Sequence, residues 1–385
     1  MDRLQPESFD KVIDRCGTHS EKWFMYEQRS VLPFWLADMD FPSPRAVIEA
    51  LKSRVEHGVF GYTRIPRGLV EAVLEMLETT YHWKISPEWL LWLPGLVTGL
   101  NVACRAVGEQ GDDVLTLIPV YPPFLTAPGN FKRKVVTVPL VLQGGRWGFD
   151  PAQIEEAITP RTRLMLLCSP HNPVGRVYDQ GELLALAEIC ARHDLVICSD
   201  EIHCALVLDQ DKRHIPTATL APEISDRTIT LMAPSKTYNL PGLGCAFAVI
   251  PNTALRKRFR QAMAGIVPHV NVMGLVAAEA AYRHGGEWLG GLLEYLRHNR
   301  DLVIARVNTM PGLMTTHVEA TYLAWIDARE TGITEPARFF EQAGVGLGNG
   351  RAFGAPGFLR LTFGCPRVLL EEALNRMERA LSSWL

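Results

Sequence analysis

The chain has 385 residues, enough to bury a large core and to form more than one domain of ordinary size. Hydrophobic residues make up 47% of it and charged residues 21%, as is usual for globular proteins. Its 39 basic and 42 acidic side chains leave a formal net charge of −3, without the basic excess that binding to nucleic acid or to anionic membranes requires. Neither kind of partner is expected.

Cysteine usage and the absence of long apolar runs bear on location. Residues 1–15 contain no apolar stretch of a secretory signal, and no run approaches the roughly 18 apolar residues of a membrane span. The eight cysteines are scattered, mostly within apolar segments, and none belongs to a Cys-x-x-Cys pair. Because disulfide frameworks have regular spacing, we expect reduced, buried thiols and a cytoplasmic protein.

From residue 90 onward, short apolar runs alternate with helical patterns. The expected strands cover residues 90–93, 113–118, 134–140, 163–169, 195–200, 228–233 and 244–250, with helices at 96–107 and 179–193. Most of these runs are continuous rather than alternating, which is typical of strands buried on both faces of a mostly parallel sheet. The alternation of strands and helices predicts a layered α/β domain.

Beyond residue 251 the pattern becomes mainly helical. Helices are expected at 252–264, 271–284, 287–308 and 336–344 and from Pro366 onward, and strands at 321–327 and 358–363. This part predicts a smaller α+β domain, whereas the start of the chain is proline-rich and irregular, as in an arm that lies over another part. The predicted division is an arm at 1–45 that joins the small domain, a large domain at 46–285 and the small domain at 286–385.

Four short motifs follow expected strands, where α/β folds bind their ligands. The first, PGLVTG at 94–99, joins a strand to a helix, so its free backbone amides could bind an anion at the helix N-terminus. An ordinary turn, with glycine chosen for its backbone angles, is the alternative. The second, CSPHNPVGR at 168–176, follows the end of a strand. Its Asn-Pro and Val-Gly pairs are typical of a loop, so an ordinary loop without a ligand is the alternative.

The other two motifs contain charged side chains. SDEIH at 199–203 places Asp200 just past a buried strand, which is costly unless the carboxylate is paired or hydrogen-bonded. A helix N-cap or a structural salt bridge is the alternative. PSKTYN at 234–239 places Lys236 among small and apolar residues, where desolvation could lower its pKa and yield a nucleophilic amine. Most lysines instead extend to solvent.

Together, the order PGLVTG, PVYPPF, SPHNPVGR, SDEIH and SKTYN resembles fold-type I pyridoxal-phosphate (PLP) enzymes of the aminotransferase class I/II superfamily. More narrowly, LPFWLADMDFPSP at 32–44, GVFGYT at 58–63 and DEIH at 200–203 look like the MalY/PatB family of cystathionine β-lyases. The likeness runs from about Phe9 to Pro366. It implies an α/β fold with a mostly parallel central sheet in a large PLP-binding domain, plus a smaller α+β domain.

The resemblance implies a role for each residue that faces the cofactor ring. Lys236 would carry PLP as a Schiff base and, once displaced by substrate, would remove the Cα proton. Asp200 would keep the pyridine nitrogen protonated, so that the ring can accept electrons. Asn172 would hydrogen-bond the 3′-oxygen of the ring, and Tyr121 would stack on its face.

The resemblance also implies how the phosphate is held. The backbone of Gly95, Leu96 and Val97 would bind it, helped by Ser235. Tyr62 would reach the same phosphate from the neighbouring subunit, which implies a homodimer with shared active sites.

For the amino-acid substrate, the resemblance implies a second set of contacts. Arg360 in FLRLTF would clamp the substrate carboxylate in a forked geometry that lysine cannot match. Trp35, Ala37 and Asp38 belong to the N-terminal arm that the family folds over the mouth of the site, and they would contact the substrate there.

Three positions depart from the wider superfamily. Ala233 and Gly244 stand where many aminotransferases have the serine and the arginine that bind the phosphate. This argues against an aspartate-type aminotransferase and makes the phosphate more dependent on backbone groups. His203 stands where many relatives have a tyrosine that contacts the 3′-oxygen, although the C–S lyase group also has histidine there. Its role stays open between contact with the ring and structural packing.

A cluster of potential metal ligands lies near the third motif: Cys190, His193, Cys198, His203 and Cys204. Structural zinc sites favour paired ligands on loops, whereas these residues fall at the end of an expected helix and inside an expected strand. No metal is expected.

The reaction that the resemblance implies is α,β-elimination from L-cystathionine or a related S-substituted cysteine, which gives a thiol, pyruvate and ammonia. A PLP-dependent aminotransferase, which uses the same lysine, is the alternative within the fold. A non-catalytic regulatory protein with the PLP fold is the alternative of another class, since a fold does not fix a function. Against it, each chemical position holds a competent residue.

Overall fold

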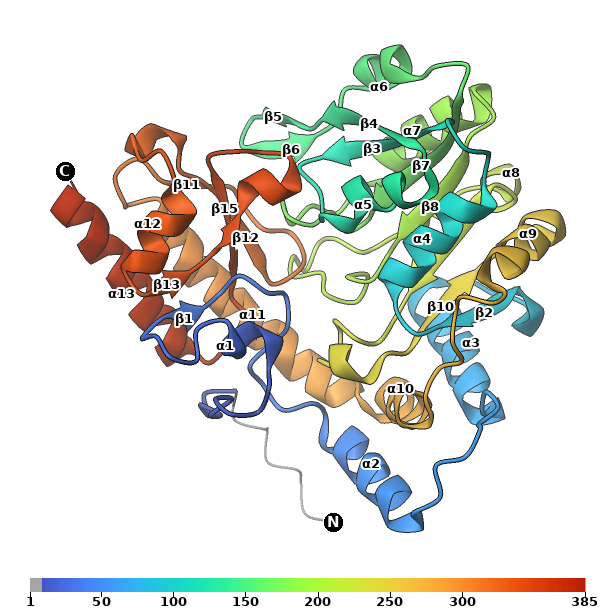
Figure 1. Ribbon diagram of the computed structural model, residues 1–385, viewed down its shortest axis with the longest axis horizontal. Helices are drawn as coiled ribbons and strands as arrows, with labels where there is room; N and C mark the ends of the chain where they lie inside the picture. The colour runs from blue at the N-terminus through green and yellow to red at the C-terminus, as the bar shows by residue number, and fades with distance from the viewer. Residues whose placement is uncertain (1–8, 385) are drawn as a thin grey trace.

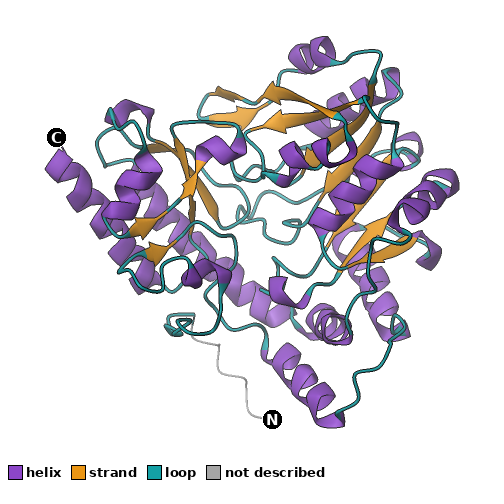
Figure 2. Cartoon of the chain, in the orientation of Figure 1, coloured by secondary structure: helices purple, strands orange, loops and turns teal. Residues whose placement is uncertain are grey.

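The fold is described by a computed structural model that covers residues 9–384. Residues 1–8, which begin the predicted arm, and residue 385 lie outside the described part. No helix within the described part is long and apolar enough to cross a membrane. Figures 1 and 2 show two sheets flanked by helices, with the N-terminal segment (blue in Figure 1) passing beside the smaller sheet.

The larger sheet has seven strands: β2 (Leu90–Leu93), β3 (Asp113–Ile118), β4 (Lys134–Pro139), β7 (Thr162–Cys168), β8 (Val196–Asp200), β9 (Thr228–Met232) and β10 (Ala246–Val249). Their spatial order is β2-β10-β9-β8-β7-β3-β4. The run from β9 to β4 is parallel, whereas β10 is antiparallel to both of its neighbours. The predicted, mostly parallel central sheet is confirmed.

Strand β7 explains why these runs are continuously hydrophobic. Leu164 and Leu166 belong to one buried cluster, and Met165 and Leu167 belong to another on the opposite face of the sheet. None of the four side chains is more than 1% exposed. Successive strand residues alternate between the two faces, so a strand that is covered on both sides needs an apolar residue at every position.

Helices cover both faces of this sheet. One face is covered by α4 (Leu96–Ala106), α5 (Pro123–Thr126) and α9 (Thr253–Met263). The other is covered by α3 (Arg67–Tyr81), α6 (Pro151–Ala157), α7 (Gln180–Arg192), α8 (Pro222–Ser225) and α10 (Val272–His284), and α2 (Arg45–His57) packs against α10. A capping box starts helix α7. The Asp179 carboxylate accepts a hydrogen bond from the backbone N–H of Glu182 at 2.9 Å, and the Glu182 carboxylate accepts one from the backbone N–H of Asp179 at 2.9 Å.

The smaller sheet has four antiparallel strands in the order β11-β12-β15-β14, namely β11 (Met314–Thr315), β12 (Leu323–Asp327), β15 (Phe358–Thr362) and β14 (Gly348–Asn349). It packs with α11 (Gly286–Val307), α12 (Pro336–Gln342) and α13 (Arg367–Trp384) around one apolar core. In the N-terminal segment, α1 (Glu21–Phe24) precedes β1 (Leu32–Pro33), which pairs in parallel with β13 (Val345–Gly346). A hairpin, β5 (Val141–Gln143) and β6 (Arg146–Gly148), completes the strands.

The strands and helices predicted beyond residue 90 are present, with ends that differ by two residues at most. The prediction does not include α2 and α3, and it treats the N-terminal segment as irregular. Both helices do have apolar residues at helical spacing, with Val47, Leu51 and Val55 in α2 and the buried Leu69, Val73 and Leu77 in α3, so this pattern was available in the sequence. Elements as short as α1 and β1 have no periodicity to detect, because they span one turn or one residue pair.

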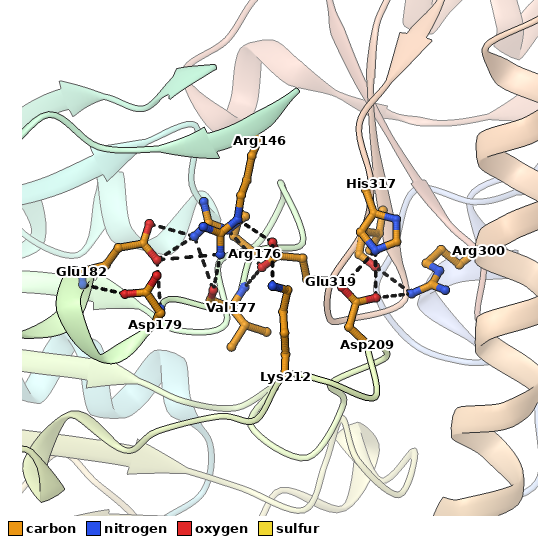
Figure 3. Close-up of polar contacts among 11 residues, drawn as sticks. Arg146, Arg176, Val177, Asp179, Glu182, Asp209, Lys212, Arg300, His317 and Glu319 are labelled. Atoms are coloured by element: carbon orange, nitrogen blue, oxygen red, sulfur yellow. Dashed lines mark hydrogen bonds and ion pairs between the residues drawn. The ribbon is translucent and has the colours of Figure 1, made fainter. Parts of the chain in front are cut away.

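A network of ion pairs joins the segment before β12 to loops of the larger sheet. Glu319 is 3% exposed and accepts hydrogen bonds from Arg146 Nε at 2.7 Å, Arg176 Nε at 3.1 Å and the backbone N–H of Val177 at 2.9 Å. Figure 3 shows this network beside a second group, in which Asp209 accepts from Arg300 and His317. Arg176 ends the predicted SPHNPVGR loop, so the network ties that loop to the smaller sheet.

We expect Glu319→Ala to destabilise the protein by about 3 kcal/mol, because it leaves a buried guanidinium with one carboxylate partner fewer. Thermal unfolding monitored by circular dichroism would measure the loss. Glu335→Ala, which removes an exposed pair with Arg338, is the matched control and should change the midpoint little. Equal effects of the two substitutions would contradict a supporting role for the network.

Candidate active site

The carboxyl ends of neighbouring parallel strands bring three of the predicted motifs to one edge of the sheet. Asp200 is the last residue of β8, Asn172 follows β7 by four residues, and Lys236 follows β9 by four residues. Tyr121 follows β3 by three residues at the same edge. Parallel strands end side by side, so the topology alone assembles these side chains.

Lys236 is held over this edge by the N-terminal segment. Its Nζ donates a short hydrogen bond to the backbone carbonyl of Ala37. Burial lowers the pKa of the amine to about 8. The charge of Arg360 also lowers this pKa, whereas the charge of Asp38 and, more weakly, that of Asp200 raise it. An amine with this pKa is partly unprotonated near neutral pH, as a nucleophile or a general base requires.

Asp200 is buried, and among residues 9–384 only the backbone N–H of Ile202 donates a hydrogen bond to its carboxylate, at 3.1 Å. Burial raises the pKa of this carboxyl to about 7; the Ile202 N–H lowers it, the charge of Glu201 raises it further, and Lys236 lowers it. A buried carboxyl with so little compensation is suited to a cationic partner, such as a protonated ring nitrogen.

Arg360, on β15, connects the smaller sheet to the same site. Its Nη1 donates to Asn172 Oδ1 at 3.2 Å and its Nη2 to the carbonyl of Trp35 at 2.8 Å. The guanidinium lies 4.7 Å from the ring centroid of Phe353, and its Nε has no partner among the described residues. Burial lowers its pKa to about 10, which still leaves the side chain cationic at neutral pH. A buried cation with a free donor is suited to a carboxylate ligand.

The start of helix α4 could hold a phosphate. Gly95 is its N-cap, and no side chain within the described part of the chain caps the first backbone N–H groups, so they can bind an anion. A Cβ built on Gly95 would meet nothing within 4 Å, so the space beside this residue is open. Leu96 is buried, Val97 is 43% exposed, and Ser235 lies next to Lys236 in the loop after β9.

Gly244 lies behind this turn, in a left-handed backbone conformation with φ of 59°. A Cβ at this position would lie 3.0 Å from the backbone oxygen of Pro94, closer than ordinary side-chain contacts. The departure at position 244 is therefore part of the local geometry, since both the backbone angle and the contact favour glycine.

The predicted residues of the arm also reach the site. The Trp35 carbonyl accepts from Arg360, the Ala37 carbonyl from Lys236, and Asp38 Oδ2 pairs with Arg15 at 2.9 Å. Tyr62 differs from all the others. It is fully exposed in the segment between α2 and α3, and none of the described residues hydrogen-bonds its hydroxyl.

His203 and Tyr121 are two further site residues whose pKa responds to the charged groups there. His203 is 2% exposed, and its Nδ1 has no partner within residues 9–384. Burial lowers its pKa to about 3, helped by the charges of Lys236 and Arg360, so the ring is neutral. Burial raises the pKa of Tyr121, while the charge of Arg360 lowers it and the charge of Asp200 raises it.

Three residues of the site escape the sequence analysis. Tyr322, just before β12, donates from its hydroxyl to the Ala37 carbonyl at 3.0 Å, and its ring centroid lies 6.0 Å from that of His203. Arg15 and Lys22 bind the loop that contains Asp38. A tyrosine at a strand start and two cations in an irregular segment carry no motif, so only the tertiary structure reveals them.

The cysteine and histidine cluster near β8 does not assemble as a ligand set. Within the described residues, no three His, Cys, Asp or Glu side chains are grouped so that they could hold a metal ion. Burial raises the pKa of Cys190 to about 12, and that of Cys204 also to about 12, as for packed thiols.

Comparison with known proteins agrees with this geometry. The model of the family "Aminotransferase class I and II" matches residues 32–377. Cystathionine beta-lyase PatB of Bacillus subtilis (strain 168) is 36% identical over 391 residues, which cover 97% of this chain and all of PatB. The crystal structure of OvoB is 48% identical, with a TM-score of 0.96, over 97% of this chain and 99% of that one.

The structure of cystalysin from Treponema denticola, described as containing a pyridoxal 5′-phosphate cofactor, is 32% identical with a TM-score of 0.93, over 97% of this chain and 98% of that one. The predicted resemblance to the superfamily and to its cystathionine β-lyase branch is thereby confirmed. The chain belongs to the aminotransferase class I and II family.

Proposed function

We propose that the protein is a pyridoxal-phosphate-dependent carbon–sulfur β-lyase that cleaves L-cystathionine, or a related S-substituted cysteine, to a thiol, pyruvate and ammonia. The observation that carries this proposal is the meeting of Lys236, Asp200 and Arg360 at one sheet edge. The full-length likeness to relatives named cystathionine beta-lyase supports the choice of reaction.

The residues at this edge fit the cofactor. The uncapped start of α4 would receive its phosphate, the buried Asp200 its ring nitrogen and the Lys236 amine its aldehyde carbon. The unpartnered Nδ1 of His203 leaves a polar atom for the ring to contact. When bound, PLP supplies an electron sink for the electrons of the substrate Cα–H bond.

The residues of the chain would bind the substrate and move its proton. Arg360 would orient the carboxylate through its unpartnered Nε and its Nη groups. Lys236, with its lowered pKa, would take the Cα proton in its neutral form. Loss of the β-thiolate and addition of water then give thiol, pyruvate and ammonia.

The other predicted contacts belong to the same proposal. Asn172 and Tyr121 would face the ring, and Ser235 and the backbone of 95–97 would bind the phosphate. Trp35, Ala37 and Asp38 would close the substrate side, as their contacts with Arg360, Lys236 and Arg15 support.

The decisive experiment is incubation with L-cystathionine, with and without a 2-oxo acid. We expect pyruvate, ammonia and thiol to accumulate in equal amounts without the 2-oxo acid. Conversion of the 2-oxo acid to its amino acid, without release of thiol and ammonia, would establish the aminotransferase instead. No turnover in either case, with PLP bound, would favour the non-catalytic alternative.

We further propose a homodimer with shared active sites. Support comes from the full exposure of Tyr62 and from three apolar neighbours that are also exposed, Val55, Val59 and Phe60. Such a patch on a single chain is typical of an interaction surface. Tyr62 would then complete the phosphate site of the partner subunit.

Mixing two inactive variants tests this arrangement. If Tyr62→Phe and Lys236→Ala act in different subunits of one site, each heterodimer contains one site with both defects and one with neither. Activity should therefore return after subunit exchange, to about a quarter of the wild-type level for random mixing of equal amounts. If mass spectrometry shows that subunits have exchanged and activity still does not recover, shared active sites are refuted.

The domain division and the location are proposals as well. The separate sheets support a large domain at 46–285 and a small domain at 286–385, and the pairing of β1 with β13 supports an arm at 1–45 that joins the latter. A cytoplasmic location is supported by eight cysteines that form no disulfide, of which only Cys16 is exposed.

A further inference from the structure

The loop at residues 38–40 is clamped by two cations of the N-terminal segment. Lys22 is completely buried, and its Nζ donates to Asp40 Oδ2 at 2.6 Å and to the Asp38 carbonyl at 3.1 Å. Arg15 Nη1 donates to Asp40 Oδ1 at 2.7 Å, and the indole of Trp23 donates to the same oxygen at 2.9 Å. A buried cation with this many partners fixes the loop it binds.

The same loop is attached to the lysine on its other side. The Ala37 carbonyl accepts from Lys236 and from the hydroxyl of Tyr322. Asn239, three residues after Lys236, accepts the backbone N–H of Met39 at 3.0 Å and donates to its carbonyl at 2.9 Å. The backbone on both sides of residue 38 is thus bound to the segment that carries the amine.

The carboxylate of Asp38 lies between these two attachments. Its Oδ2 pairs with Arg15 at 2.9 Å, and its Oδ1 lies 3.8 Å from Lys22 Nζ, without a hydrogen-bond partner in the described structure. Besides Lys236, the titratable groups that its charge reaches include Arg15 and Tyr322. We propose that Asp38 is a positioning residue that sets the charge state of Lys236, and that Arg15 and Lys22 hold it in place.

The charges that face Lys236 make Asp38 the main favourable partner of the ammonium. Asp38 raises the pKa of the amine more than Asp200 does, while burial and Arg360 lower it. His203 also faces the amine, but as a neutral ring. Removing the negative charge at position 38 should therefore lower the pKa of Lys236, and removing the cation that balances it should raise that pKa.

The inference rests on the proposed function, but its test does not require turnover. In the full-length protein stripped of cofactor, the pKa of Lys236 is measured by acetic-anhydride labelling of its peptide at increasing pH. We expect Asp38→Asn to lower this pKa by about half a unit or more, and Arg15→Met to raise it. In the PLP-loaded protein, the pH midpoint of the visible absorption band should move in the same two directions.

Arg29→Met is the matched control. Arg29 belongs to the same N-terminal segment, but its side chain is 49% exposed and pairs with Glu341 instead of Asp38. It should leave the pKa of Lys236 unchanged. Opposite shifts of the Lys236 pKa in Asp38→Asn and Arg15→Met support the inference. No shift in this pKa, or shifts in the same direction, overturn it. If Asp38→Asn does not fold, the direction of the shift in Arg15→Met decides. If no preparation, including the wild type, shows lyase activity, the proposed function is refuted, but the labelling result still tests the inference.

Discussion

Replacing Lys236 with alanine should reduce the rate of cystathionine cleavage by about a thousandfold or more, because in the proposed reaction this one side chain would supply both the cofactor anchor and the proton acceptor. The pKa of about 8 means that a fraction of wild-type Lys236 is the neutral amine near neutral pH. The loss should appear in kcat, since Arg360, the proposed carboxylate ligand, is unchanged in this variant. Steady-state kinetics of pyruvate release would measure it.

The matched control is Lys257→Ala, on the exposed surface of α9, which should leave kcat unchanged. Borohydride reduction of the loaded wild-type protein should attach the cofactor to the peptide that contains Lys236. A Lys236→Ala enzyme that turns over at the wild-type rate would remove the basis of the proposed reaction.

For Asp200→Asn, we expect a loss of about a hundredfold or more in kcat, since a neutral amide cannot keep the ring nitrogen protonated. The amide oxygen can still accept the Ile202 N–H, so the fold should survive. Asp226→Asn, on the exposed end of α8, is the control. Nearly full activity of Asp200→Asn would make this carboxyl a structural group only.

The pKa of Asp200 also predicts how stability depends on pH in cofactor-free protein. Burial raises it from 3.8 to about 7, so between these values the folded state holds a proton that the unfolded state has released. Unfolding then becomes easier as the pH rises from about 4 to about 7. Relative to Asp200→Asn, the wild type should lose stability across this window, as denaturant titrations at several pH values would measure.

The sequence was sufficient for the large sheet because β7 and its neighbours are buried on both faces, and such strands have an unmistakable composition. It also predicted the strand-end residues Asp200, Asn172 and Lys236, since parallel topology brings strand ends together. The roles of these residues are still predictions, and the variants above would test those of Asp200 and Lys236.

Contacts between distant segments could not be derived in this way. Tyr322 meets Lys236 only through the Ala37 carbonyl, and the contact depends on how the smaller sheet sits against the larger one. Lys22 has no motif around it, and its complete burial depends on Asp40, 18 residues away. Neither local propensity nor periodicity contains this information.

The left-handed turn at Gly244 limits how this scaffold could evolve. An arginine there would need a strained backbone, at about 1 kcal/mol or more, and would press its Cβ against the Pro94 oxygen at 3.0 Å. A single substitution therefore cannot install an aminotransferase-like phosphate anchor without displacing the turn that precedes α4. Substitution at position 244 is therefore coupled to the turn before α4, and an arginine there would be accommodated only together with a change in that turn.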